Sequence, residues 1–143
     1  MRVKTVLAAA LVAAIITGPA LAGLKPITIM NDGGGQLWRY HRSVVVTERA
    51  GNPVKFVGSC ASACTLFLTI PNKRLCIYPT ARFGFHQAHG STPSANAMAS
   101  KKLLDSYPVW VRHWINSRGG LVPGDRIDWM PYEYAARFLR TCF

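Results

Sequence analysis

Short β-branched segments alternate with segments of helical periodicity, and this alternation constrains the fold more than any other feature. Residues 26–30 have the composition of a strand, and the glycine-rich turn at 31–35 ends it with residues that tolerate positive φ. Apolar residues then recur at helical spacing from Leu37, and this helix is expected to end near residues 50–53. Residues 54–57 are the next predicted strand. Strands joined by helices predict an α/β fold with a parallel sheet.

The rest of the chain continues the pattern. Residues 61–68 are typical of a short buried helix, and residues 74–78 and 82–85 of two more strands. A helical stripe follows a polar loop, and Pro108 is expected to break or kink it. Residues 131–139 fit a short amphipathic helix that a proline opens.

The N-terminus has the organisation of a secretory signal peptide. Two basic residues precede an eleven-residue apolar core at 6–16, and the small-x-small sequence at 20–22 is typical of a cleavage site. The apolar core is too short to span a bilayer as a helix. We therefore expect residues 1–22 to be removed. Residues 23–143 are then predicted to form one periplasmic or extracellular domain without a transmembrane segment.

The chain is strongly basic. Residues 23–143 contain 15 lysine and arginine residues against 6 aspartate and glutamate residues, a formal charge of +9. The basic residues are scattered along the chain rather than gathered in a run. For an exported protein this favours anionic envelope components, such as lipid head groups or acidic glycans, over nucleic acid as partners.

Four cysteines are present: Cys60, Cys64, Cys76 and Cys142. An even number of cysteines in an oxidising compartment favours disulfide bonds, and four cysteines allow three pairings. Zinc would need further ligands close to the Cys60-x-x-x-Cys64 pair, and no CxxC or HxxxH pattern supplies them. The sequence predicts structural disulfides, with no metal and no cofactor.

Ser62 and His86 stand where a nucleophile and its base could meet. Ser62 follows a predicted strand and begins a predicted helix, where free backbone N–H groups and the positive end of the helix dipole gather. Its neighbours Ala61 and Ala63 are small enough for a substrate carbonyl to approach the backbone. The glycines at 33–35 and His86 end neighbouring strands, and ligands bind at that carboxyl edge of a parallel sheet.

Simpler interpretations exist for each residue. Taken alone, Ser62 is most often a helix N-cap, and His86 a core histidine bonded to the backbone. The glycines at 33–35 form a tight turn under either interpretation. The catalytic hypothesis depends on the combination of the serine, the histidine and the glycine turn.

These pieces carry a family resemblance. The segments Asn31-Asp-Gly-Gly-Gly35, Gly58 to Ala63, Arg74 to Pro79 and Arg82 to Gln87 resemble, in this order, the Clp-protease/crotonase superfamily. The likeness extends to its small exported members with an S-A-C serine, and it covers about residues 27–88 well. It implies a Clp-protease/crotonase-like parallel sheet with flanking helices. The fold would be N-terminally abbreviated, because only about eight residues of the mature chain precede Asn31.

The resemblance also implies roles for individual residues. Ser62 resembles the nucleophile and His86 the general base, and the N–H groups of Gly35 and Ala63 would form the oxyanion hole. The triad aspartate of the family lies before a short helix like that at residues 131–139, which makes Asp128 the candidate and Asp125 the reserve. Such an aspartate would orient the histidine and stabilise its charge. The implied function is an exported serine hydrolase, a peptidase that cleaves peptide or protein substrates.

A different class of function stays open. The same fold could serve as a non-catalytic, basic, disulfide-stabilised binding module that keeps the pocket without the chemistry. A crotonase-like role with coenzyme A ranks below both, because that substrate is scarce outside the cytoplasm. The sequence leaves the oligomeric state open, and no ATPase partner is expected.

Overall fold

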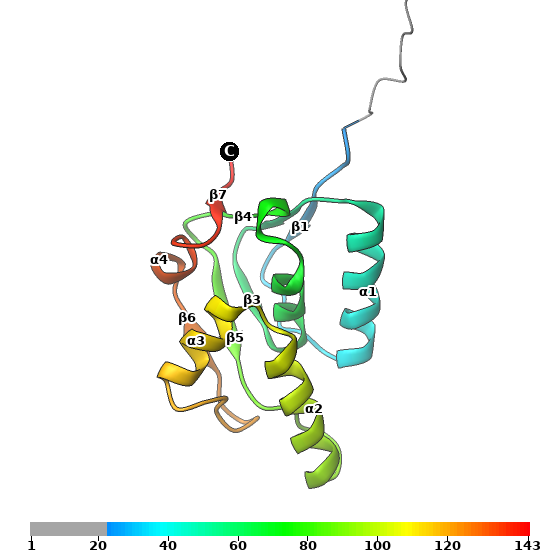
Figure 1. Ribbon diagram of the computed structural model, residues 1–143, viewed down its shortest axis with the longest axis vertical. Helices are drawn as coiled ribbons and strands as arrows, with labels where there is room; N and C mark the ends of the chain where they lie inside the picture. Colours follow the sequence, from blue (N-terminus) through cyan, green and yellow to red (C-terminus); the bar gives the residue numbers. More distant parts are fainter. Residues whose placement is uncertain (1–22) are drawn as a thin grey trace, which may run out of the picture.

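The computed structural model describes residues 23–143, and the predicted signal peptide at residues 1–22 lies outside the described residues. Strands and helices follow one another along the chain as Figure 1 shows. In order, they are β1 (Ile27–Ile29), α1 (Leu37–Ala50), β2 (Val54–Phe56), β3 (Ser59–Ala61), the 3-10 helices η1 (Ser62–Thr69) and η2 (Asn72–Arg74), β4 (Leu75–Ile77), β5 (Arg82–Phe85), α2 (Pro93–Ser106), α3 (Val109–Ser117), β6 (Asp128–Met130), α4 (Tyr132–Ala135) and β7 (Arg140–Thr141).

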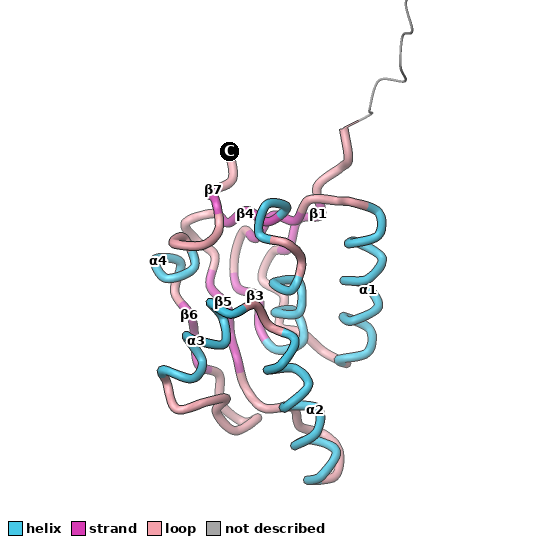
Figure 2. The backbone as a smooth tube through the Cα atoms, in the orientation of Figure 1, coloured by secondary structure: helices cyan, strands magenta, loops and turns pink. Residues whose placement is uncertain are grey.

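A four-stranded parallel sheet forms the centre of the fold, with the strand order β1-β2-β4-β7. Apolar residues of its two middle strands are fully buried, including Val54 and Phe56 on β2 and Leu75 and Ile77 on β4. Figure 2 shows α1 at one side of the molecule and α4 at the other, with β7, β4 and β1 across the end that carries the C-terminus. The predicted α/β class and the parallel sheet with flanking helices are confirmed.

A second sheet was not predicted. It has the order β3-β5-β6, in which β3 and β5 are parallel and β5 and β6 are antiparallel. The chain leaves the first sheet at Val57 and Gly58, where a β-carbon on Gly58 would collide with the Asn31 side-chain amide. The Asn31 Oδ1 atom accepts the Ser59 backbone N–H at 3.1 Å, which directs the chain into β3. The sequence showed that a strand ends at Gly58 but not that another begins directly after it.

The helix α1 begins and ends where the sequence predicts. Gly51 adopts the left-handed conformation, with φ of 78°, and its N–H donates to carbonyls of the last turn. Val44 and Thr47 are the buried residues of α1. The predicted buried helix at 61–68 is a 3-10 helix, η1, at 62–69, and α1 packs against it.

Pro108 separates α2 from α3, as predicted. Its pyrrolidine ring removes a backbone donor, and the preceding residue, Tyr107, is extended rather than helical. The rings of Tyr107 and Trp114 both pack on Phe85, with ring centroids 5.4 and 5.7 Å away, and this joins the two helices to β5. The helix predicted over residues 131–139 is shorter than expected, because only Tyr132–Ala135 is α-helical before the chain returns as β7.

All four cysteines are paired in disulfide bonds, as predicted. Cys60 is bonded to Cys64 and Cys76 to Cys142, a choice among three pairings that the sequence left open. The second bond fastens the C-terminal segment to the middle of the four-stranded sheet, where β7 pairs with β4. Disulfide bonds are compatible with an oxidising compartment.

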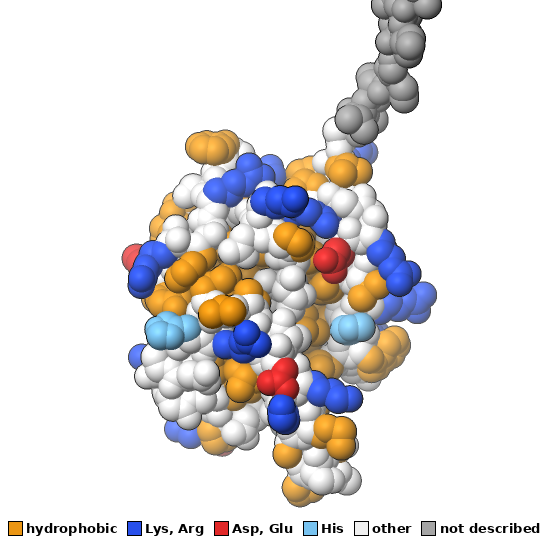
Figure 3. Space-filling view, viewed as in Figure 1, with side chains coloured by type: hydrophobic (Ala, Val, Ile, Leu, Met, Phe, Trp, Pro, Cys, Tyr) orange, Lys and Arg blue, Asp and Glu red, His pale blue; other side chains and the backbone are white. Residues whose placement is uncertain are grey.

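The basic side chains of the described residues are spread over the surface, as their scattered positions in the sequence predict. Figure 3 shows lysine and arginine side chains spread over the visible face, with few acidic side chains between them. None of the helices within residues 23–143 combines the length and the apolar character that crossing a bilayer requires.

Candidate active site

Ser62 occupies the junction between β3 and η1 in an unusual backbone conformation. Its φ is +57°, whereas Ala61 before it is extended, with φ of −120° and ψ of 159°. Within residues 23–143, Asn31 is the only other non-glycine residue with positive φ. The left-handed conformation costs a side-chain-bearing residue about 1–2 kcal/mol, and such strain concentrates at functional sites.

The Ser62 side chain does not cap the helix. Ala61 occupies the N-cap position of η1, and no side chain makes a capping hydrogen bond there. The Ser62 carbonyl oxygen instead accepts a 2.6 Å hydrogen bond from the Thr65 hydroxyl, which holds the first turn closed. The commonest structural use of a serine at a helix start therefore does not explain Ser62.

The glycine turn lies directly beside this serine. A β-carbon on Gly34 would stand 2.7 Å from the Ser62 Cβ and 2.8 Å from the Ala63 nitrogen. Gly34 also has φ of +81°, a conformation that favours glycine. The absence of a side chain at Gly34 thus allows the turn to approach Ser62 and the backbone N–H of Ala63.

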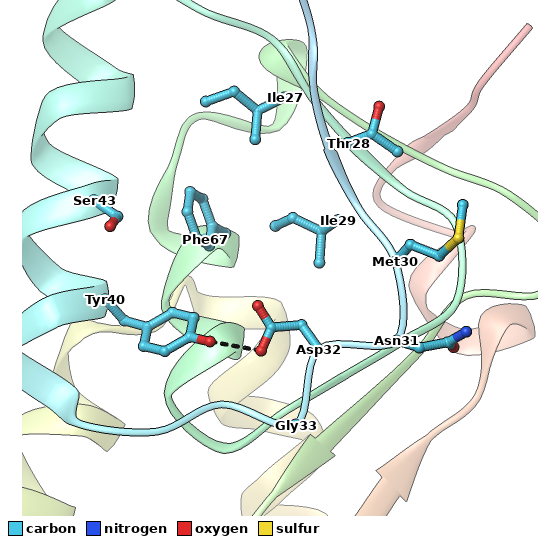
Figure 4. Close-up of a pocket in the computed structure, with 10 residues that line it drawn as sticks. All are labelled: Ile27, Thr28, Ile29, Met30, Asn31, Asp32, Gly33, Tyr40, Ser43 and Phe67. Atoms are coloured by element: carbon cyan, nitrogen blue, oxygen red, sulfur yellow. Dashed lines mark hydrogen bonds between the residues drawn. The ribbon is translucent and has the colours of Figure 1, made fainter.

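Asp32 organises the glycine turn, a role that the sequence analysis missed. One carboxylate oxygen accepts the Gly34 N–H at 2.8 Å and the Tyr40 hydroxyl at 2.6 Å. Figure 4 shows this contact, with Tyr40 reaching from α1 across to Asp32 at the end of β1. Burial, together with the hydrogen bond to Asp32, raises the pKa of Tyr40 to about 12. The available signal was the spacing: Tyr40 stands on the first turn of the predicted helix, eight residues after Asp32.

His86 follows β5 and is 7% exposed. Its Nδ1 atom lies 2.7 Å from the Gln87 carbonyl oxygen. A carbonyl oxygen can only accept, so Nδ1 carries the proton in this contact. In the neutral imidazole the other ring nitrogen, Nε2, then has the free lone pair, which is the form that a general base needs.

The structure brings these residues to one cavity of about 910 Å³. Ser62 and His86 both line it, and so do the three glycines of the turn and the loop that carries His89. The His89 ring lies 5.3 Å from the His86 ring, centroid to centroid. The lining consists of Gly33, Gly34, Gly35, Gln36, Leu37, Ser62, His86, Ala88, His89, Gly90, Ser91, Ala95, Asn96, Ala99, Gly124, Asp125 and Ile127.

The two predicted oxyanion donors differ in their relation to the cavity. Gly35 lines it together with Ser62, whereas Ala63, the residue after Ser62, is buried and is not among the lining residues. Ala63 belongs to the first turn of η1, where backbone N–H groups have no preceding helical carbonyl to bond. Within the described chain, the Ser62 hydroxyl and the His86 ring make no hydrogen bond to each other. In unliganded enzymes such contacts are often long and tighten when substrate binds.

The two candidate aspartates have different surroundings. The Asp128 carboxylate accepts two hydrogen bonds from the Arg118 guanidinium, at 2.9 and 3.2 Å, and these contacts raise the pKa of Arg118. Asp128 pairs across the sheet with Phe85, and residues paired in this way project to the same face. His86 is the next residue after Phe85, so the alternation of a strand would direct its side chain to the opposite face from Asp128. Asp125, the reserve candidate, is exposed and lines the cavity with Ser62 and His86.

Comparisons with known proteins bear on the fold. No model of a protein family matches the chain, and no curated protein matches it. Among solved structures, the crystal structure of an enzyme superposes with a TM-score of 0.53 at 13% sequence identity, over 82% of this chain and 76% of that one. A peptidase from Plasmodium falciparum superposes with a TM-score of 0.50 at 13% identity, over 82% of this chain and 75% of that one.

The chain shares its fold with an enzyme and a peptidase. At 13% identity this likeness concerns only the arrangement of strands and helices. The chemistry of the site depends on the side chains around Ser62.

Proposed function

We propose that this protein is an exported serine hydrolase of the Clp-protease/crotonase superfamily that cleaves peptide or protein substrates through an acyl-enzyme. The observation that carries the proposal is the combination at one cavity of Ser62, in a strained left-handed conformation, with His86, whose Nδ1 is bonded to a carbonyl oxygen. The fold likeness to a peptidase agrees with this proposal.

The proposed reaction begins at the Ser62 hydroxyl. His86 Nε2 takes the hydroxyl proton while Ser62 Oγ attacks the substrate carbonyl carbon. The N–H groups of Gly35 and Ala63 then stabilise the negative charge that develops on the carbonyl oxygen. His86 returns the proton to the leaving amine, and water, activated by the same imidazole, hydrolyses the acyl-enzyme.

The third member of the proposed site is a backbone group. The Gln87 carbonyl oxygen orients His86 by accepting its Nδ1 proton, which is the geometric part of the work of a triad aspartate. A neutral carbonyl stabilises an imidazolium less than a carboxylate does, so a slower enzyme is expected than one with a complete triad. Asp125, which lines the same cavity, is the carboxylate best placed to add charge stabilisation.

Covalent labelling tests the proposal. A fluorophosphonate should modify the folded protein at Ser62, as identified by mass spectrometry of the labelled peptide, and Ser62→Ala should remove the label. His86→Ala should slow labelling by about 1000-fold or more, the scale of losing a triad member. Ser91 lines the same cavity, so Ser91→Ala is the matched control and should label normally. Failure of the folded wild-type chain to react with probes of several sizes would contradict the proposal.

A second candidate function is the non-catalytic basic binding module. The observation in its favour is that Asp128, the carboxylate expected beside His86, is engaged by Arg118 instead. This candidate predicts no labelling at Ser62 and binding to anionic vesicles or acidic polysaccharides that weakens as salt rises. Labelling that depends on both Ser62 and His86 would exclude it.

A further inference from the structure

The disulfide bond between Cys60 and Cys64 spans Ser62 symmetrically. Cys60 lies on β3 two residues before the serine, and Cys64 lies in the first turn of η1 two residues after it. The Cα atoms of the two cysteines are 5.4 Å apart. The bond therefore joins the two ends of the bend on which Ser62 sits.

We propose that the Cys60–Cys64 disulfide is a positioning device for the Ser62 nucleophile. The bond holds Ser62 in its left-handed conformation and fixes the direction of the adjacent Ala63 N–H. The inference rests on the proposed hydrolase function, and it adds a requirement that the function alone does not contain: full reactivity of Ser62 depends on this covalent bond.

The backbone of Ser62 needs such a restraint. A residue with a side chain stays at φ of +57° only when its surroundings determine the conformation, because its own preference is for negative φ. Relaxation toward negative φ would change the direction of the Ser62 side chain and rotate the Ala63 N–H. A covalent bond between positions 60 and 64 limits both movements.

Non-covalent contacts restrain the same bend from other sides. The Thr65 hydroxyl donates to the Ser62 carbonyl oxygen, so the buried Tyr107 hydroxyl must be the donor in its own contact with Thr65. Gly34 packs against the Ser62 Cβ. The bend is thus held through its carbonyl, its side chain and its two flanking cysteines.

The Cys60–Cys64 bond is expected to contribute less to the stability of the whole fold than the Cys76–Cys142 bond. A disulfide stabilises mainly by restricting the unfolded chain, and the effect grows with the length of the closed loop. The Cys60–Cys64 bond links residues 4 apart in sequence, whereas the Cys76–Cys142 bond links residues 66 apart. The short bridge is therefore suited to fixing local geometry, and the long one to holding the fold.

A redox role for the short bridge is not supported by its environment. Cys60 and Cys64 are both fully buried, with 0% exposure. Thiol–disulfide exchange requires a thiolate to reach one of the sulfur atoms, and access is lacking here. This burial favours a permanent restraint over a catalytic or regulatory disulfide.

Paired removal of each disulfide tests the inference. The variants are Cys60→Ala with Cys64→Ala and, as the matched control, Cys76→Ala with Cys142→Ala. For each we would measure circular dichroism, the thermal midpoint, and the saturating rate and half-saturating concentration of fluorophosphonate labelling at a temperature well below unfolding. Mass spectrometry would confirm Ser62 as the labelled residue.

The expected result separates reactivity from stability. Loss of the Cys60–Cys64 bond should lower the saturating labelling rate by about 10- to 100-fold, the scale of misplacing a reacting group by about 1 Å, with little change in the half-saturating concentration. Loss of the Cys76–Cys142 bond should lower the thermal midpoint more but leave the labelling rate within about twofold.

Each other outcome has a defined meaning. Equal labelling rates in the wild type and in the Cys60→Ala, Cys64→Ala variant would overturn the inference while leaving the hydrolase proposal intact. Failure of that variant to fold would also overturn it, because the bridge would then serve the fold rather than the serine. Absence of labelling in the wild type would reject the hydrolase proposal itself.

Discussion

Gly34 lies directly against Ser62, so close that a β-carbon at position 34 would stand 2.7 Å from the serine Cβ and 2.5 Å from the Ala61 carbonyl oxygen. These neighbours are backbone atoms or a β-carbon, which cannot move aside as the end of a long side chain can. The contact ties the geometry of the glycine turn to that of the serine bend.

Gly34→Ala should therefore disable the site. We expect the fluorophosphonate labelling rate to fall by about 100-fold and the free energy of unfolding by about 2–4 kcal/mol, from the positive φ and from overpacking together. Gly120→Ala is the control, since Gly120 has φ of +99° but no atom within 4 Å of an added β-carbon. The control should lose only about 1–2 kcal/mol and label normally. Equal effects of the two substitutions would show that the contact with Ser62 is unimportant.

Asp128→Asn should have little effect on reactivity. Its carboxylate is bonded to Arg118, and the Gln87 carbonyl already accepts the His86 Nδ1 proton. We expect the labelling rate to change by less than about threefold, compared with about 10⁴-fold for an aspartate that holds a catalytic histidine. Asp125→Asn would be measured alongside, and a loss of about 1000-fold in either variant would assign that aspartate to the triad.

Arg74→Met should loosen the helix that supports the site. The Arg74 guanidinium donates hydrogen bonds to carbonyl oxygens at the end of α1 and beyond it, which belong to Thr47, Glu48 and Asn52. The Thr47 and Glu48 carbonyls also accept the Asn52 and Gly51 N–H groups, so methionine would leave the Asn52 carbonyl without the hydrogen bond that it accepts from Arg74. We therefore expect a loss of about 1–3 kcal/mol in the free energy of unfolding, measured by urea denaturation. Lys73→Met, at the exposed neighbouring position, should stay within about 0.5 kcal/mol of the wild type.

Tyr40 should make stability depend on alkaline pH. Folding raises its pKa from 10.0 to about 12, so the folded chain favours the neutral phenol. The resulting stabilisation is fully present below about pH 10 and is lost as the pH rises toward about 12. The difference in unfolding free energy between the wild type and Tyr40→Phe should therefore shrink across this interval. A difference that stays constant from about pH 8 to about pH 12 would contradict the assignment.

Local pattern was sufficient for much of the fold. The helix Leu37–Ala50, its end at Gly51, the strand Val54–Phe56 and the break at Pro108 all follow from apolar spacing, β-branched composition, and the backbone properties of glycine and proline. These features depend on residues a few positions apart, so a single sequence contains their cause.

The same reasoning predicted that several candidate residues would meet at one edge of the sheet. Ser62, His86 and the glycine turn end successive segments of an α/β pattern, and such ends share one edge in a parallel arrangement. The common cavity of Ser62, His86 and Gly35 agrees with that expectation. Their roles remain predictions that labelling must test.

Contacts between distant segments decided the rest. The second sheet depends on the hydrogen bond from the Ser59 N–H to Asn31. The strand β7 depends on its pairing with β4, and the position of the Asp128 carboxylate depends on its hydrogen bonds with Arg118. The choice of cysteine partners likewise needed the fold, because only folding brings Cys142 to within 5.0 Å of Cys76, Cα to Cα. Sequence spacing carries no information on such approaches. The conformation of Ser62 itself belongs to this group, since a backbone that opposes its own preference is set by the atoms packed around it.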